Sequence, residues 1–115
     1  MSKREARLYL TDIDDAISAI RSYTDEMTFE QLLDDRKTRE AVILNFVVIG
    51  EAIKKIPPDI INRYPDVPWN EFAGMRDKMV HGYFSISPTI LWETIRQDLS
   101  PLALAVKKLL KEYSQ

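Results

Sequence analysis

The chain of 115 residues has no cysteine, a single histidine and only three glycines. Without cysteine it can form no disulfide and offers no thiolate as nucleophile or metal ligand, which fits a reducing compartment. Three glycines are too few for a glycine-rich phosphate-binding loop. With one histidine, a zinc site would need several carboxylates or residues from two chains. We therefore expect no metal site.

Long hydrophobic runs are also missing. The longest one, residues 41–50, is interrupted by Asn45 and is too short to span a bilayer. Charged residues interrupt the first ten positions, where a secretory signal would need an apolar core. We therefore expect a cytoplasmic protein without a membrane segment. The net charge of −2 argues against a broad basic surface, so any contact with nucleic acid should be confined to a small basic cleft.

The apolar residues that are present follow helical spacing. They recur every three or four positions over residues 4–23, 36–56 and 69–83, which predicts three long helices. The helix over 36–56 has a wide apolar stripe that includes Leu44 and Val48, so we expect neighbouring elements to cover it on several sides.

Capping residues and prolines mark the remaining boundaries. Residues 28–31 form a capping box that opens a short helical turn. Pro57 and Pro58 end the long helix, and Ser87 with Pro88 starts another. Pro101 then either kinks that helix or opens a new one. Since no stretch alternates as a surface strand does, the sequence predicts a single all-α domain over residues 1–115, a bundle of four or five helices.

Residues 76–83, Arg-Asp-Lys-Met-Val-His-Gly-Tyr, concentrate the groups that could perform chemistry. Arg76 is a planar cation that can bind a phosphate through two hydrogen bonds. His81 can take and give protons near neutral pH. The pair would suffice to cleave RNA without a metal, because the 2′-hydroxyl of RNA can attack its own phosphodiester. DNA lacks that hydroxyl, so this mechanism selects RNA.

The spacing within this stretch poses a geometric question. A spacing of five residues on a regular helix leaves two side chains roughly 140° apart, so Arg76 and His81 should not point the same way. Either the helix unwinds near Gly82, or the site is composed of two chains related by a two-fold axis. Asp77, four residues before His81, is placed to contact its imidazole.

A structural role is the alternative for each of these residues. Arg76 and His81 could simply be a capping or ion-pair detail at the end of a core helix, and Lys78 could be solvated. Tyr83 could be a core or interface aromatic residue. Glu51, a carboxylate in the most apolar helix, must be paired, exposed or functional. We expect it to form an ion pair with Arg76 or Arg39 that positions the cleft, while Gly50 beside it marks close packing of another helix.

The sequence resembles the HepT-like family of the HEPN superfamily. The family motif R-x4-H, followed by x-Y, is matched by Arg76, His81 and Tyr83. Asp77 stands where many members of the superfamily carry asparagine. Further matches in the same order extend over nearly the whole chain: Phe29, Asp35-Arg36-Lys37-Thr38, Ala41-Val42, Ile49-Gly50-Glu51-Ala52, Pro68-Trp69, Gly74-Met75, Phe84, Trp92-Glu93-Thr94 and Asp98-Leu99.

The resemblance implies a homodimeric, HEPN-like helical bundle with a composite cleft. It implies a metal-independent endoribonuclease, the toxin of a type II-like toxin–antitoxin system, with Arg76 and His81 catalytic. From the residues themselves we expect Glu51, Asp77 and Lys78 to support the cleft. The partner would be a minimal nucleotidyltransferase antitoxin that silences the toxin by AMPylation of Tyr83. An AMP group there would fill and neutralise the phosphate site.

A non-catalytic role would give the same stretch a different meaning. The chain could be a helical binding partner that docks a nucleotidyltransferase or holds a nucleotide in the same cleft. The two hypotheses differ on His81. A ribonuclease needs its proton transfer, whereas a binding protein should tolerate a neutral polar replacement such as asparagine or glutamine.

Overall fold

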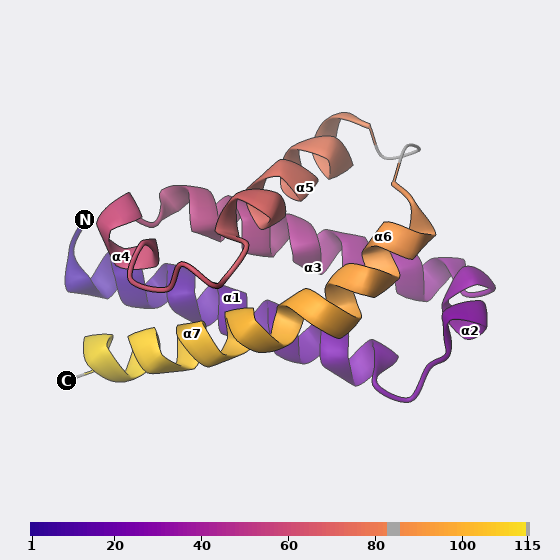
Figure 1. Ribbon diagram of the computed structural model, residues 1–115, viewed down its shortest axis with the longest axis horizontal. Helices are drawn as coiled ribbons and strands as arrows, with labels where there is room; N and C mark the ends of the chain where they lie inside the picture. The colour runs from indigo at the N-terminus through magenta and orange to yellow at the C-terminus, as the bar shows by residue number, and fades with distance from the viewer. Residues whose placement is uncertain (83–85, 115) are drawn as a thin grey trace.

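Three long helices give the molecule its shape in a computed structural model that describes residues 1–82 and 86–114 (Figure 1). Helices α1 (Lys3–Thr24), α3 (Arg36–Lys55) and α7 (Leu99–Tyr113) run along the long axis, and α5 (Trp69–His81) lies over α3. α1 packs against both α3 and α7, and α3 also packs against α5. No strand occurs in the described ranges, so the predicted all-α class is confirmed.

The helix boundaries follow the local signals in the sequence. Thr28 and Gln31 form the predicted capping box of α2 (Phe29–Leu33): the Thr28 hydroxyl accepts from the Gln31 backbone at 3.1 Å, and the Gln31 side chain accepts from the Thr28 backbone at 2.9 Å. α3 ends before the two prolines, and α4 (Pro58–Ile61) is a single short turn. α6 (Pro88–Glu93) has Ser87 as its N-cap, as predicted: the Ser87 hydroxyl accepts a hydrogen bond from the Ile90 backbone.

Pro101 was expected either to kink the helix that starts at Pro88 or to open a new helix, and the structure shows a third arrangement. Between α6 and α7 the chain continues through one π-helical turn, η2 (Thr94–Asp98), and Pro101 then sits in the first turn of α7. A proline has no N–H for a helical hydrogen bond, and π-helix, although rare, occurs mostly as a single turn within an α-helix. The two helices therefore form one continuous segment with a changed pitch (Figure 1).

The core is built from the inward faces of α1, α3, α5 and α7. Its largest fully buried side chain is Phe46, which stacks on Phe72 of α5 with ring centroids 6.3 Å apart. The expectation that neighbouring elements cover α3 on several sides is confirmed, since α1, α2 and α5 all pack against it. Its remaining face is open: Leu44 is 64% exposed and Val48 is 37% exposed. The apolar stripe of α3 therefore extends beyond the part that these neighbours bury.

Within residues 1–82 and 86–114, no helix combines the length and the apolar character that crossing a bilayer requires.

Candidate functional site

Helix α5 carries the Arg-x4-His sequence and is anchored at both ends. Trp69 at its start is buried, and its indole N–H donates to the Tyr64 carbonyl at 2.9 Å. At its end, the Gly82 N–H donates to the Lys78 carbonyl at 2.7 Å. The helix therefore stays wound through His81, and it does not unwind between the arginine and the histidine.

Gly50 of α3 is the point where α5 comes closest. A Cβ atom at Gly50 would meet the Cβ and Cγ atoms of Arg76, the latter at 2.9 Å, and the Phe72 carbonyl oxygen at 2.9 Å. Cβ atoms in real proteins essentially never come this close to other heavy atoms, so only glycine fits here without a shift of the helices. The predicted close-packing role of Gly50 is confirmed, and its consequence is that the Arg76 side chain emerges directly over α3.

Arg76 is held there by two carboxylates. Its Nη2 lies 2.6 Å from an oxygen of Glu51, and its Nη1 donates to Asp77 Oδ1 at 3.0 Å. The predicted Glu51–Arg76 ion pair is thus confirmed. Asp77 Oδ1 also accepts from Lys54 Nζ at 2.5 Å, so two acids and two bases from α3 and α5 alternate in one network. The network fixes the guanidinium on the α3 side of α5.

The network also shifts the pKa values of Arg76 and Asp77. The hydrogen bond to Asp77 is the main cause that raises the pKa of Arg76 above its ordinary value, and the charge of Glu51 adds to it. Hydrogen bonds from Lys54 and then from Arg76 lower the pKa of Asp77. The Arg76 side chain is only 22% exposed, and its Nε is buried without a hydrogen-bond partner among the described residues. Arg76 is therefore a fixed, partly desolvated cation, the kind of group that stabilises a developing negative charge.

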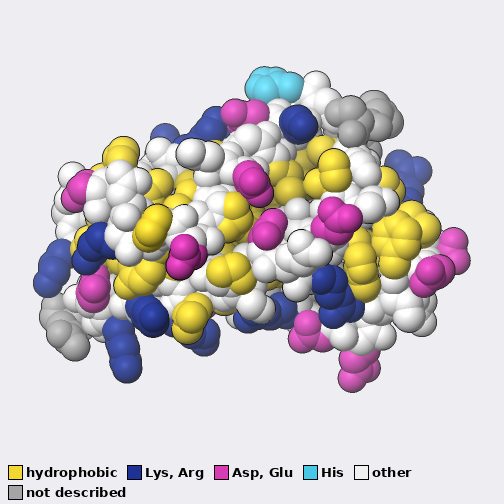
Figure 2. Space-filling view, viewed as in Figure 1, with side chains coloured by type: hydrophobic (Ala, Val, Ile, Leu, Met, Phe, Trp, Pro, Cys, Tyr) yellow, Lys and Arg dark blue, Asp and Glu magenta, His cyan; other side chains and the backbone are white. Residues whose placement is uncertain are grey.

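His81 lies apart from this network. It is an exposed residue in the last turn of α5, and as the chain's one histidine it is the cyan side chain that projects at the edge of the molecule in Figure 2. The expected contact with Asp77 is not made: among the described residues no hydrogen bond joins the two, because Asp77 is engaged by Lys54 and Arg76. His81 is accessible to a substrate and to water.

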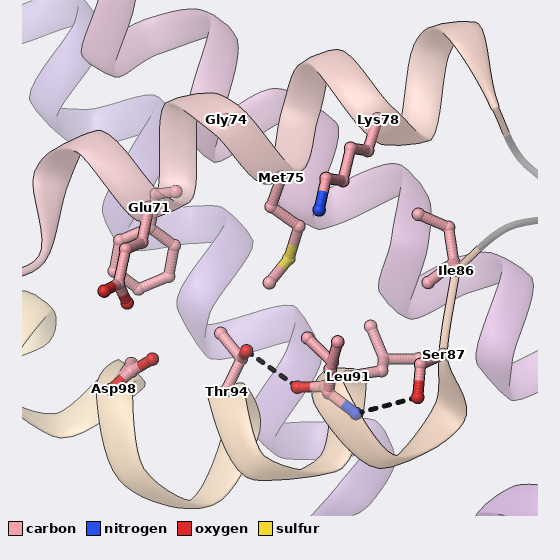
Figure 3. A pocket seen from close by; sticks show the side chains of 11 residues that line it. Glu71, Gly74, Met75, Lys78, Ile86, Ser87, Leu91, Thr94 and Asp98 are labelled. Atoms are coloured by element: carbon pink, nitrogen blue, oxygen red, sulfur yellow. Dashed lines mark hydrogen bonds between the residues drawn. The ribbon is translucent and has the colours of Figure 1, made fainter.

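A cavity of about 370 Å³ lies on another side of α5, between this helix and the α6–η2 segment (Figure 3). Met75 and Lys78 of α5 point toward it, and Glu71 faces Asp98 of η2 across its far end. Burial, with the nearby charge of Glu71, raises the pKa of Asp98. Lys78, predicted as a supporting cleft residue or a solvated one, lies at the mouth of this cavity.

The structure thus separates the predicted site residues into groups. It brings Arg76, Asp77 and Glu51 together and leaves His81 and Lys78 outside their network. Tyr83 lies outside the described residues. Sequence reasoning missed Lys54, although its position three residues after Glu51 on α3 places both on one helix face.

The carboxylates of this region do not form a metal-binding group. Within the part of the chain that the structure describes, no three histidine, aspartate or glutamate side chains cluster so that they could hold a metal ion.

Comparison with known proteins places this arrangement in a family. The model of the family described as "Ribonuclease HepT-like" matches residues 13–109. The chain is 44% identical over 109 residues to the "Probable ribonuclease HepT" of Thermococcus cleftensis, covering 95% of this chain and 99% of that one. It is 39% identical over 112 residues to a protein of Methanocaldococcus jannaschii named "Putative RNase", covering 97% and 93% of the two chains. No solved structure gives a significant match. The chain therefore belongs to the HepT-like ribonuclease family of the HEPN superfamily.

Proposed function

We propose that this protein is a metal-independent endoribonuclease in which Arg76 and His81 are the catalytic residues. His81, as general base, takes the proton of a ribose 2′-hydroxyl, whose oxygen then forms a bond to the adjacent phosphorus. The P–O5′ bond breaks, and the leaving 5′ oxygen takes up a proton from an acid. The products are a 2′,3′-cyclic phosphate and a 5′-hydroxyl. Arg76 binds the non-bridging oxygens, on which negative charge accumulates.

One observation carries this proposal: α5 holds Arg76 as a fixed, partly desolvated cation while it presents His81 to solvent. A purely structural arginine would need no exposed proton carrier on the same helix. The names of the relatives agree with this reading, since two of them are designated as ribonucleases.

The reaction is best explained with two chains. α5 is helical through His81, so a rotation of roughly 140° separates the directions of Arg76 and His81 within one chain. A two-fold dimer would place the His81 of one protomer opposite the Arg76 of its partner. Each of the two sites of the dimer would then combine one Arg76 and one His81 from different protomers.

Regulation by a nucleotidyltransferase follows from the family resemblance and belongs to the same proposal. The protein would act as the toxin of a toxin–antitoxin pair, and its antitoxin would attach AMP to Tyr83. Tyr83 is two residues from His81 in the sequence, so an anionic AMP group there would compete with the RNA phosphate for the cationic site.

The test is an RNA cleavage assay with purified protein in EDTA. The wild type should cut a mixed RNA pool and leave 2′,3′-cyclic phosphate ends, while a folded His81→Ala variant should not. A His81→Gln variant separates the two hypotheses, because a binding protein would tolerate it. If the wild type fails to cut and mass spectrometry shows unmodified Tyr83, the ribonuclease proposal is wrong.

A further inference from the structure

The cavity between α5 and the α6–η2 segment is not used by the chemistry described above. Its volume of about 370 Å³ falls within the range of roughly 300–1,000 Å³ that is typical of small-molecule sites. Its middle is lined by the apolar side chains Phe72, Met75, Ile86 and Leu91. Ser87 and Thr94 add hydroxyl groups to this lining, and the charged side chains Lys78, Glu71 and Asp98 lie toward its two ends.

The two ends carry opposite charges. Lys78 lies at one end, and Glu71 and Asp98 face each other at the other (Figure 3). Glu71 and Lys78 are seven residues apart on α5, which corresponds to about 10 Å along the helix axis. A ligand that lies along the cavity therefore meets an ammonium group at one end and carboxylates at the other.

The carboxylate end lacks partners of its own. Among the described residues, neither the Glu71 nor the Asp98 carboxylate accepts a hydrogen bond or forms an ion pair; both line the cavity, where Glu71 is exposed and Asp98 is half-buried. Burial and the charge of Glu71 raise the pKa of Asp98, as expected for a desolvated carboxyl without a donor. A ligand that donates N–H groups would supply hydrogen bonds to both carboxylates and reduce the repulsion between their charges.

The position of the cavity relates it to the proposed reaction. Lys78 lies one helical turn before His81 on the same flank of α5, since residues three apart are neighbours on a helix. An RNA strand with its scissile phosphate at His81 would have an adjacent nucleotide beside Lys78. That nucleotide's base could enter the cavity, stack on its apolar wall and reach Glu71 and Asp98.

We propose that this cavity is the base-recognition subsite of the enzyme, and that it takes an unstacked guanine next to the scissile phosphate. Guanine presents two adjacent N–H donors, N1–H and the 2-amino group, to a carboxylate. Cytosine and adenine present one amino group each, and uracil presents a single N–H flanked by two carbonyl oxygens that carboxylates repel. Single-stranded RNA is commonly read in this way, by stacking and by hydrogen bonds to the base edge. The inference rests on the proposed ribonuclease function for its biological meaning but not for its test.

The test measures binding of mononucleotides rather than cleavage. Protein labelled in its methionine, isoleucine and leucine methyl groups is titrated with guanosine and uridine 3′-monophosphates and followed by NMR. We expect the methyl resonances of Met75, Ile86 and Leu91 to shift with guanosine monophosphate. Guanosine monophosphate should bind more tightly than uridine monophosphate by about tenfold or more, which corresponds to 1.4 kcal/mol.

Two variants and their matched controls locate the site. Glu71→Gln combined with Asp98→Asn should remove the guanosine preference, whereas Glu26→Gln, a remote exposed carboxylate, should leave it unchanged. Gly74 lines the cavity, and a Cβ there meets nothing within 4 Å. Gly74→Leu should therefore fill the cavity and abolish binding while the helix stays folded, and Gly74→Ala should largely retain binding.

The outcomes separate this inference from the proposed function. If the protein cuts RNA but binds the two mononucleotides equally, or shifts only methyl groups outside the cavity, the subsite is wrong and the ribonuclease stands. If guanosine monophosphate shifts the cavity methyl groups of a protein that cuts no RNA, the subsite stands and the ribonuclease fails. An absence of methyl shifts at the highest soluble concentration would overturn the subsite.

Discussion

Gly50 and Arg76 form the contact that fixes the geometry of the site: the side-chain stem of Arg76 lies against the one residue of α3 that has no side chain. The approach lets the guanidinium reach Glu51, the next residue along α3, at 2.6 Å. The close packing at Gly50 therefore places Arg76 where it can form its ion pair with Glu51. Changes at Gly50 should alter stability and activity together.

Gly50→Ala should destabilise the fold by about 1–3 kcal/mol, the usual cost of overpacking, because its Cβ would press on Arg76 and on the Phe72 carbonyl. Gly74→Ala is the matched control on the facing helix. It adds a methyl group in open space and should stabilise the protein by about 0.4–1 kcal/mol. Urea denaturation followed by circular dichroism measures both. Equal effects of the two substitutions would contradict the close approach.

Glu51→Gln should lower the catalytic rate roughly tenfold to a hundredfold, because it removes the charge that orients Arg76 without touching substrate. Stability should change by less than about 1 kcal/mol, since the Glu51 side chain is half-exposed. Glu40→Gln, in the exposed ion pair with Arg36 on the same helix, is the control and should leave the rate unchanged. A large loss of stability without a change in kcat would assign Glu51 a purely structural role.

Asp77→Asn should change how stability depends on acid. Lys54 and Arg76 lower the pKa of Asp77 in the folded state, so the folded state releases this proton more readily than the unfolded chain. The stabilisation is therefore present above the unfolded pKa of about 3.9 and is lost as the pH falls through the folded value. Thermal melts from pH 7 to pH 2 should show less acid destabilisation in Asp77→Asn than in the wild type. Parallel pH profiles would show that the network has no such effect.

Asp98→Asn should show the opposite pattern. Burial raises the pKa of Asp98, so its contribution is present below the unfolded pKa and is lost as the pH rises through the folded value. The variant should therefore gain stability relative to the wild type above about pH 4, and this gain should disappear in acid. The same melts provide the measurement. A variant that is less stable at pH 7 would indicate that Asp98 has a partner in the folded protein.

The sequence allowed the helices and one ion pair of the charge network, Glu51–Arg76, to be predicted because these depend on local rules. Periodicity gave the long helices, the side chains of Thr28 and Ser87 gave two helix starts, and the carboxylate of Glu51 in an apolar helix required a partner. Each of these signals lies within a few residues of its effect.

Features that depend on tertiary neighbours were not predictable in this way. The exposure of Leu44 reflects which flank of α3 has a packed helix, and periodicity alone does not determine that. In place of the expected contact with His81, Asp77 accepts a hydrogen bond from Lys54, a residue of another helix. The cavity needs Glu71 and Asp98 from segments that only the fold brings together.

The central claim is that Arg76 and His81 of opposing protomers cut RNA together, and mixing two inactive variants tests it most directly. Arg76→Ala and His81→Ala proteins are purified, shown to be folded and inactive, and mixed under conditions that exchange subunits. Half of the dimers would then be heterodimers with one intact site of two, so about a quarter of the wild-type cleavage rate should return. Mass spectrometry of differently tagged chains confirms the exchange. Complete inactivity of a mixture that contains heterodimers would contradict the account.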